Sequence, residues 1–122
     1  MDKLPVPPKE SVFYEDSKVY ACLAENPMAR GHAVVVWKED VEDLRMLSRS
    51  DFEYLMDVVD RVRNAMLKAL RIEKIYLLYM DEVRHVHWHL VPRYRKEGMD
   101  AFHDASAKPG DFSLAPELKD FL

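Results

Sequence analysis

Apolar residues change their spacing several times along the chain, and each spacing predicts a different element. Residues 11–15 and 18–24 are short runs rich in β-branched and aromatic residues with a polar pair between them, which predicts two strands joined by a tight turn. Residues 32–38 are almost continuously apolar, as expected for a strand that is buried on both faces. A short helical turn is predicted within residues 40–47.

The next segment has the periodicity of a helix. Ser50 and Glu53 have the spacing of a capping box, so we expect a helix from Asp51 to about Arg71. Within it, apolar residues recur at intervals of three and four and form one stripe that can pack on a sheet. The members of this stripe are Phe52, Leu55, Val59, Val62, Met66 and Leu70.

Two further strands are predicted after the helix. They cover residues 74–80 and 83–94, with Asp81 and Glu82 in the turn between them. Pro92 is expected to end the second of these strands, because proline cannot donate a hydrogen bond to a sheet.

The two ends of the chain lack this periodicity. Residues 1–10 contain three prolines and predict an extended N-terminal arm, and residues 97–122 predict an irregular polar tail with one short helix. The order of elements predicts an α+β fold, with an antiparallel sheet of about five strands, one long helix and a short helix. A length of 122 residues suits a single domain over residues 1–122.

Composition excludes several classes of protein. Apolar residues make up 48% of the chain and charged residues 33%, which is typical of a globular protein with a real core. The formal charge of -4 argues against binding along a nucleic-acid backbone, and the single cysteine rules out an intramolecular disulfide. No apolar stretch is long enough for a signal peptide or a membrane span, so we expect a cytoplasmic protein with no membrane or nucleic-acid partner.

Three histidines stand at two-residue spacing in the last predicted strand. Alternate side chains of a strand share a face, so His85, His87 and His89 should line one wall while the apolar residues between them point to the core. With five histidines in 122 residues, this pattern is expected by chance only about 0.008 times. The row therefore indicates a site, and the basic residues that flank it, including Arg93, favour an anionic ligand.

Two kinds of chemistry use such a row of imidazoles. Zinc could bind two of the three rings, but a row of about 13 Å is long for one ion, which would need a further ligand such as Asp81 or Glu82. Alternatively, a neutral imidazole could attack phosphorus while the flanking rings donate hydrogen bonds to the phosphate oxygens. An unperturbed pKa of about 6.5 leaves such a nucleophile mostly neutral at pH 7.

The motif His85-Val86-His87-Trp88-His89-Leu90-Val91 resembles that of the histidine triad (HIT) superfamily of nucleotide hydrolases and transferases. The continuation Pro-Arg-Tyr resembles its fragile-histidine-triad-like and bacterial dinucleoside polyphosphate hydrolase branches. The segment Asn-Pro-Met-Ala-Arg-Gly-His is similar to the part of the family that supplies a fourth active-site histidine, which would be His32.

The resemblance implies a hydrolase or transferase that acts at the α-phosphate of a nucleotide conjugate, either a dinucleoside polyphosphate or a nucleoside phosphoramidate. His87 would carry a covalent nucleotidyl intermediate, and His32, His85 and His89 would orient it, bind phosphate oxygens or assist the leaving group. It also implies a homodimer whose sheets join across the two-fold axis. No cofactor is required, although a polyphosphate could bring a divalent cation.

Three departures from the family pattern affect substrate binding. Met80, Asp81 and Glu82 stand where a Gly-Gln or Gly-Asn pair often precedes small residues. A carboxylate there would repel polyphosphate unless the loop turns outward, binds a metal or meets a cationic leaving group. The second histidine that often follows the strand after His32 is replaced by Asp40.

The position that commonly meets the ribose in the family falls on Ala24, with Glu25 and Asn26 next to it. We therefore take Asn26, Asp81 and Arg93 as the candidate substrate-binding residues. Two alternatives stay open: a non-catalytic nucleotide-binding protein on the same fold, and a metal-binding protein that uses a pair of the triad histidines.

Overall fold

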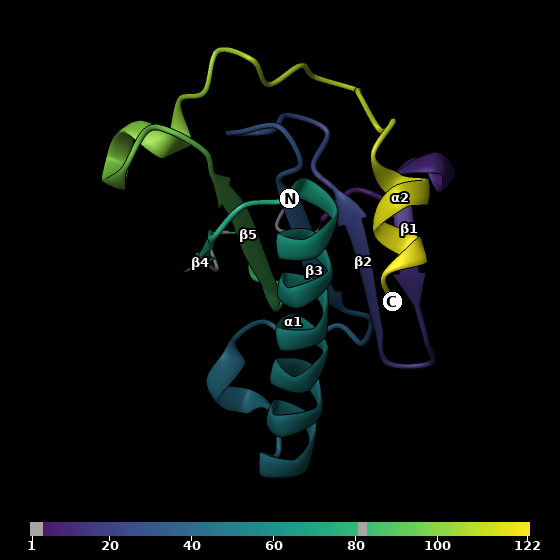
Figure 1. The fold of residues 1–122 in the computed structure, drawn as a ribbon. Helices are drawn as coiled ribbons and strands as arrows, with labels where there is room; N and C mark the ends of the chain where they lie inside the picture. Colours follow the sequence, from purple (N-terminus) through teal and green to yellow (C-terminus); the bar gives the residue numbers. More distant parts are fainter. Residues whose placement is uncertain (1–3, 81–82) are drawn as a thin grey trace.

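The computed structural model describes residues 4–80 and 83–122, and it confirms the predicted α+β fold. One antiparallel sheet has the strand order β1-β2-β3-β5-β4 (Figure 1). Its strands are β1 (Val12–Glu15), β2 (Val19–Leu23), β3 (Ala33–Trp37), β4 (Lys74–Tyr79) and β5 (His87–Arg93). The helices are α1 (Arg49–Leu70) and α2 (Ala115–Asp120), with short 3₁₀ helices η1 (Lys9–Ser11), η2 (Leu44–Met46) and η3 (Gly98–Phe102).

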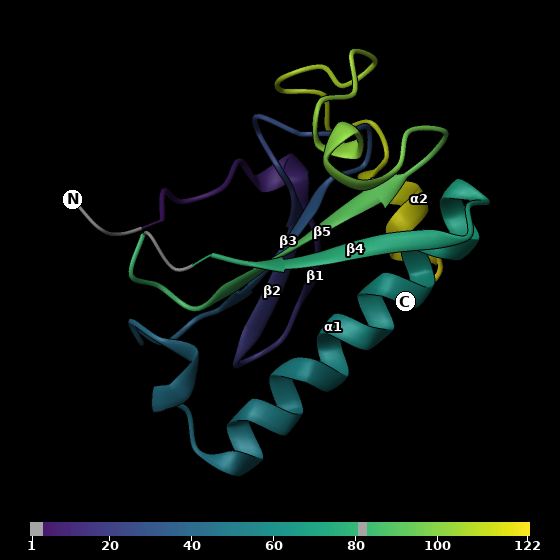
Figure 2. The ribbon, with the colours of Figure 1, turned by 90° about the vertical axis from the view of Figure 1, so that its left-hand side faces the viewer.

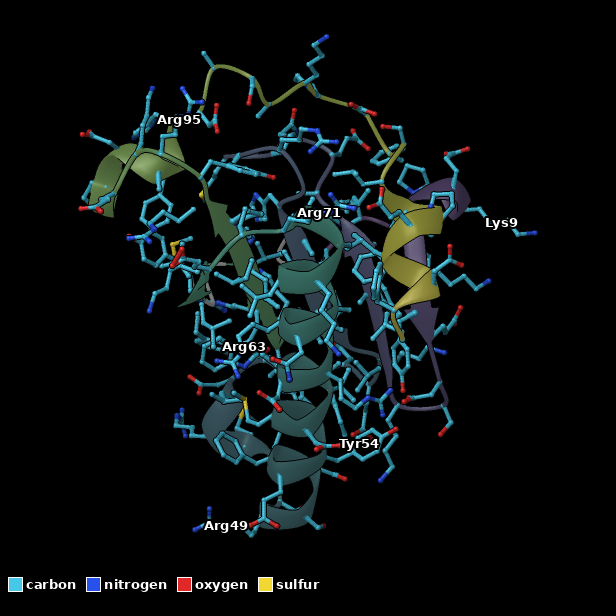
Figure 3. All side chains as sticks on the ribbon, viewed as in Figure 1. Lys9, Arg49, Tyr54, Arg63, Arg71 and Arg95 are labelled. Atoms are coloured by element: carbon cyan, nitrogen blue, oxygen red, sulfur yellow. The ribbon has the colours of Figure 1, made fainter. Side chains whose placement is uncertain are left out.

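The core lies between α1 and one face of the sheet. Figure 2 shows α1 crossing beneath the strands, and Figure 3 follows the helix from Arg49 through Tyr54 and Arg63 to Arg71. Each fully buried aliphatic side chain stabilises this packing by about 1.5–3 kcal/mol. The buried stripe of α1 consists of Leu55, Val58, Val59, Val62, Ala65, Met66 and Ala69.

The start of α1 differs from the prediction. The helix begins at Arg49, and its N-cap is Ser48, whose Oγ accepts a hydrogen bond of 3.1 Å from the backbone N–H of Asp51. Ser50 lies inside the first turn instead. Both serines have an acidic residue three positions later, so the spacing alone does not distinguish the two caps. The predicted end is close to the observed one, because Arg71 is the left-handed C-cap.

The last strand also differs from the prediction at both ends. β5 begins at His87, because Arg84 has a φ of 53° and His85 still lies in the preceding turn. Pro92 was expected to end the strand but lies within it, before Arg93. β3 pairs with β5 only as far as Leu90, so beyond this residue β5 is in effect an edge strand on that side and tolerates proline.

The hairpin between β1 and β2 is fastened to α1 through Asp16. One carboxylate oxygen accepts hydrogen bonds from the backbone N–H groups of Lys18 and Val19, and the other accepts from the hydroxyls of Tyr14 and Tyr54. Burial alone would raise the pKa of Asp16, but these four donors hold it well below its usual range. The predicted turn at this position is therefore confirmed.

Candidate active site

The face of the sheet opposite α1 brings the predicted histidines together. His87 and His89 lie on β5, an inner strand of the sheet, where their partners on β3 are Val36 and Val34. His32 immediately precedes β3 and follows Gly31, whose φ of 86° allows the tight turn at this point. His85 approaches the same face from the turn before β5.

The backbone determines which nitrogen of His87 carries the proton. This ring is 3% exposed, and its Nδ1 lies 2.6 Å from the carbonyl oxygen of His85. Since a carbonyl only accepts hydrogen bonds, Nδ1 must be the donor. In the neutral ring, Nε2 therefore holds the lone pair, which is the form that a nucleophile needs.

His32 and His89 form a second hydrogen-bonded chain. The backbone N–H of Met28 donates to Nδ1 of His32 at 3.0 Å, which leaves the proton of the neutral His32 ring on Nε2. That nitrogen lies 2.9 Å from Nδ1 of His89 and donates to it. The proton of His89 is then on Nε2, so this ring can donate a hydrogen bond to an acceptor in the site.

Burial keeps this pair of rings uncharged. Desolvation and the neighbouring His89 lower the pKa of His32 to about 3. Desolvation and the neighbouring His87 lower the pKa of His89 to about 4. Both rings are thus neutral hydrogen-bond donors at neutral pH, rather than cations.

His85 is anchored to the end of β3 and to the residues that follow it. Its Nε2 donates to the carbonyl oxygen of Trp37 at 2.6 Å, and its Nδ1 lies 3.9 Å from a carboxylate oxygen of Asp40. The ring thereby ties the turn before β5 to the end of β3. It still faces the same side of the sheet, where it lines a cavity with Tyr20 and Val36.

A groove lies between the N-terminal segment and the sheet, with His85 in its lining. We call it the arm groove. It has two adjoining parts of about 180 and 460 Å³, and Val34 and Val36, the strand partners of His89 and His87, line it. The lining is mainly apolar, so the groove suits a flat organic ring. Both parts are lined by Leu4, Pro5, Val6, Pro7, Tyr20 and Val36.

The candidate substrate-binding residues have different positions. Asn26 lines the smaller part of the arm groove together with Ala24 and Glu25. Arg93 lies further along β5, where one guanidinium nitrogen is 3.4 Å from a carboxylate oxygen of Glu97. Asp81, like Glu82, lies outside the described residues.

Sequence reasoning missed the backbone partners of the histidines. The N–H of Met28 and the carbonyl of Trp37 orient two of the four rings. Every residue has these groups, so no residue type marks them in a sequence. The sequence indicated the apolar lining of the arm groove only weakly, through the prolines of the N-terminal arm.

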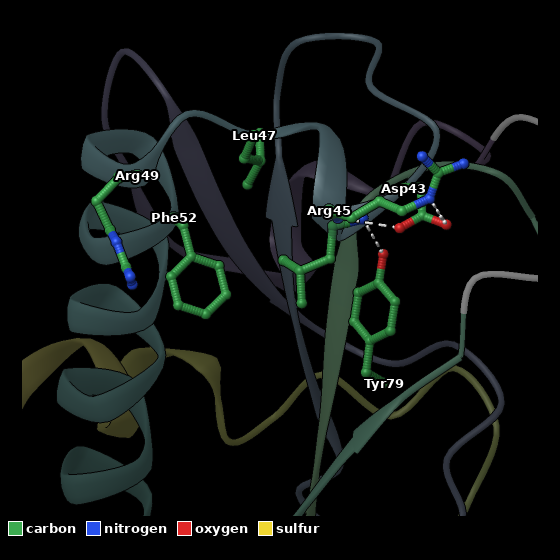
Figure 4. Close-up of a pocket in the computed structure, with 7 residues that line it drawn as sticks. Asp43, Arg45, Leu47, Arg49, Phe52 and Tyr79 are labelled. Carbon is green, nitrogen blue, oxygen red and sulfur yellow. Dashed lines mark hydrogen bonds and ion pairs between the residues drawn. The ribbon is translucent and has the colours of Figure 1, made fainter.

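A second cavity, of about 600 Å³, lies on the α1 side of the sheet (Figure 4). None of its described lining residues is a histidine. The cavity is lined by Asp43, Leu44, Arg45, Leu47, Arg49, Phe52 and Tyr79.

Over residues 4–80 and 83–122, no group of three or more His, Cys, Asp or Glu side chains could hold a metal ion. No helix in this part of the chain combines the length and apolar character of a membrane span.

Comparison with protein families finds a match to the HIT domain over residues 8–96. The chain is 34% identical over 95 residues to an uncharacterised HIT-like protein of Borreliella burgdorferi, which covers 70% of this chain and 67% of that protein. It is 35% identical over 95 residues to another from Methanocaldococcus jannaschii, with 71% of each chain covered.

Solved structures share the fold. A Streptococcus mutans protein is 28% identical with a TM-score of 0.67, and the match covers 74% of this chain and 61% of that one. The diadenosine triphosphate hydrolase of Plasmodium falciparum, solved with cyclomarin A, has a TM-score of 0.74 over 94% of this chain and 78% of its own. At 15% identity, the second likeness shows the fold alone.

Proposed function

The chain belongs to the HIT family, and on this premise we propose that it hydrolyses nucleotide conjugates at the α-phosphate through a covalent intermediate on His87. The observation that carries the proposal is the hydrogen bond from Nδ1 of His87 to the carbonyl of His85, because it leaves the lone pair on Nε2. His89 supports it as a neutral donor beside the nucleophile, with ring centroids 5.0 Å apart.

The reaction takes place in two displacements at one phosphorus atom. Nε2 of His87 first bonds to the α-phosphorus, and the bond to the bridging oxygen or nitrogen breaks with its electron pair leaving on that atom. A polyphosphate departs as an anion, whereas an amine takes a proton from solvent. Water then attacks the phosphorus, the nucleoside monophosphate is released, and Nε2 regains its lone pair while the proton of the water passes to solvent.

The other residues bind the substrate in this proposal. The N–H on Nε2 of His89 donates to a non-bridging oxygen, where negative charge grows in the transition state. The nucleobase occupies the arm groove, with Asn26 beside the sugar. Arg93 is proposed to supply positive charge to the anionic substrate, and Asp81 is proposed as a further substrate-binding residue that suits a cationic leaving group better than a polyphosphate. A divalent cation enters only as the counterion of a polyphosphate.

Diadenosine triphosphate hydrolysis, the activity named for the Plasmodium falciparum structure, belongs to the proposed reaction class. The proposed substrates are therefore dinucleoside polyphosphates and nucleoside phosphoramidates. Both present an α-phosphate to the same nucleophile and differ only in the leaving group.

We also propose a homodimer in which the β4 edges of two copies pair. β4 is an edge strand in the described sheet. Leu77, which lies on β4, is 38% exposed, and Met80, which follows the strand, is 40% exposed. Unpaired edges with apolar side chains favour pairing with another strand. Light scattering should give twice the chain mass for the wild type and the mass of one chain for Leu77→Lys. A wild-type mass of one chain would contradict the dimer.

The activity is tested by incubating the protein with an adenosine phosphoramidate and with a diadenosine polyphosphate. Wild-type protein should release AMP, and His87→Asn should not. His103→Asn is the matched control, because His103 is an exposed histidine of the tail. Stabilisation by AMP without turnover would instead favour the non-catalytic nucleotide-binding protein.

A further inference from the structure

The turn between β2 and β3 is held by a later part of the chain. In Figures 1 and 2, the segment after β5 passes over this turn on its way to α2. Three backbone carbonyls of the turn accept hydrogen bonds from this segment. The bonds run from Gly110 N–H to Glu25 O (2.9 Å), from Asp104 N–H to Met28 O (3.0 Å) and from the Tyr94 hydroxyl to Arg30 O (2.5 Å).

The same turn sets the protonation of His32. Met28 accepts from Asp104 through its carbonyl and donates to Nδ1 of His32 through its N–H. The backbone N–H of His32 in turn donates to the carbonyl of Ala29 at 3.0 Å. A displacement of this turn would therefore remove the donor that places the proton of His32 on Nε2.

The tail also closes the far side of His32. Lys108, Asp111 and Leu114 line, with Gly31 and His32, a cavity of about 10 Å³, which is about the size of one water molecule. His32 is 2% exposed behind this wall. The tail thus contributes to the burial that keeps the ring neutral.

We propose that Tyr94 and residues 104–110 are positioning elements of the active site, which hold the turn so that His32 donates to His89. Residues 104–110 lie beyond the HIT domain match, which ends at residue 96. The inference rests on the proposed function for its kinetic consequence. Its structural consequence, the position of the ring protons, can be measured without turnover.

The chemical consequence follows from the hydrogen-bonded chain. If Met28 no longer donates to His32, the proton of that ring can move to Nδ1, and its Nε2 becomes an acceptor. His89 must then place its own proton on Nδ1 to preserve their contact. Its Nε2 loses the proton that would be donated to the phosphate, so kcat falls. KM changes little when only the Tyr94 hydrogen bond is removed, because the hydrogen bond from Gly110 to Glu25 still holds the turn beside Asn26.

Tyr94→Phe tests the proposal because it removes one hydroxyl and keeps the ring. We expect kcat to fall about fivefold, the cost of one ordinary hydrogen bond, with KM within about twofold of wild type. Nitrogen NMR of the imidazoles should show that His32 and His89 no longer hold their protons only on Nε2. Tyr76→Phe is the matched control, because its hydroxyl accepts from Gly98, outside the turn.

Unchanged kcat and unchanged ring-nitrogen signals in Tyr94→Phe would overturn the proposal. An equal loss of kcat in both tyrosine variants, without a change in those signals, would also overturn it by showing a merely structural effect. If wild-type protein turns over no nucleotide conjugate, the proposed function fails, and the NMR comparison still decides whether Tyr94 positions the rings.

Discussion

The two faces of β5 hold their side chains in different ways. On the face toward α1, Leu90 is fully buried and is held by apolar packing alone. On the opposite face, His87 is almost as deeply buried but is held by a hydrogen bond from its ring to a backbone carbonyl. Burial contributes stability on the first face, whereas on the second it costs free energy that hydrogen bonds offset.

The comparison extends to the tryptophans on the α1 side. The indole N–H groups of Trp37 and Trp88 are buried and have no hydrogen-bond partner among the described residues. An unpartnered buried donor costs about 1–3 kcal/mol. On the other face, each of the four histidine rings has at least one ring nitrogen in a hydrogen bond. Orientation therefore matters on the histidine face, whereas volume matters on the α1 face.

Substitutions on the two faces should separate activity from stability. His87→Asn should lower kcat by at least about 10³-fold, because the nucleophile is lost. Leu90→Ala should lower the free energy of unfolding by about 2–5 kcal/mol through the cavity that it leaves, while folded protein keeps most of its kcat. Urea unfolding and single-turnover kinetics on both variants measure the contrast. If His87→Asn and Leu90→Ala lost kcat and free energy of unfolding equally, the contrast between the two faces would be contradicted.

Acidification should lower the free energy of unfolding through the buried histidines before it affects the apolar core. The unfolded chain binds a proton on His32 below pH 6.5, whereas the folded chain does not until about pH 3. The free energy of unfolding should therefore fall as the pH falls from 6.5, by up to about 1.4 kcal/mol per pH unit from this residue. His89 acts in the same direction, with its pKa lowered to about 4.

Urea unfolding of wild type and His32→Asn between pH 6.5 and 4.5 isolates this effect. The window lies above the range in which most carboxylates titrate. The variant should be less stable at neutral pH but should lose less stability on acidification. Parallel curves for the two proteins would show that His32 is not kept neutral by the fold.

Chelation should have the smallest effect. The described residues contain no group of three or more His, Cys, Asp or Glu side chains that could hold a metal ion, and the proposed nucleophile is an imidazole rather than a metal-bound water. EDTA should leave phosphoramidate turnover within about twofold of the untreated rate. A large loss that added zinc restores would favour a metal site built on the triad histidines.

Periodicity predicted those features that depend on which side of an element faces the core. Alternation in the last strand correctly placed Trp88 and Leu90 toward α1 and His87 and His89 on the other face, whereas His85 lies in the turn before the strand. Intervals of three and four correctly indicated α1 and most of its buried stripe. These patterns succeed because apolar burial depends on residue type.

Features set by the backbone could not be predicted in this way. The start of β5 depends on a left-handed residue, Arg84, whose residue type does not favour that conformation. The proton positions of His32 and His85 depend on the N–H of Met28 and the carbonyl of Trp37, which only the folded chain brings near. The roles of Asn26 and Arg93 stay predictions, since their positions are compatible with substrate contact but do not test it.

The central claim is that His87 carries the nucleotidyl group. Rapid mixing with a nucleotide ester of an activated leaving group, followed by an alkaline quench, should increase the mass of the protein by one nucleotidyl group. Tryptic digestion should place this increase on the peptide from His85 to Arg93, and fragmentation should assign it to His87. Turnover without any adduct, or an adduct on a different residue, would contradict the account.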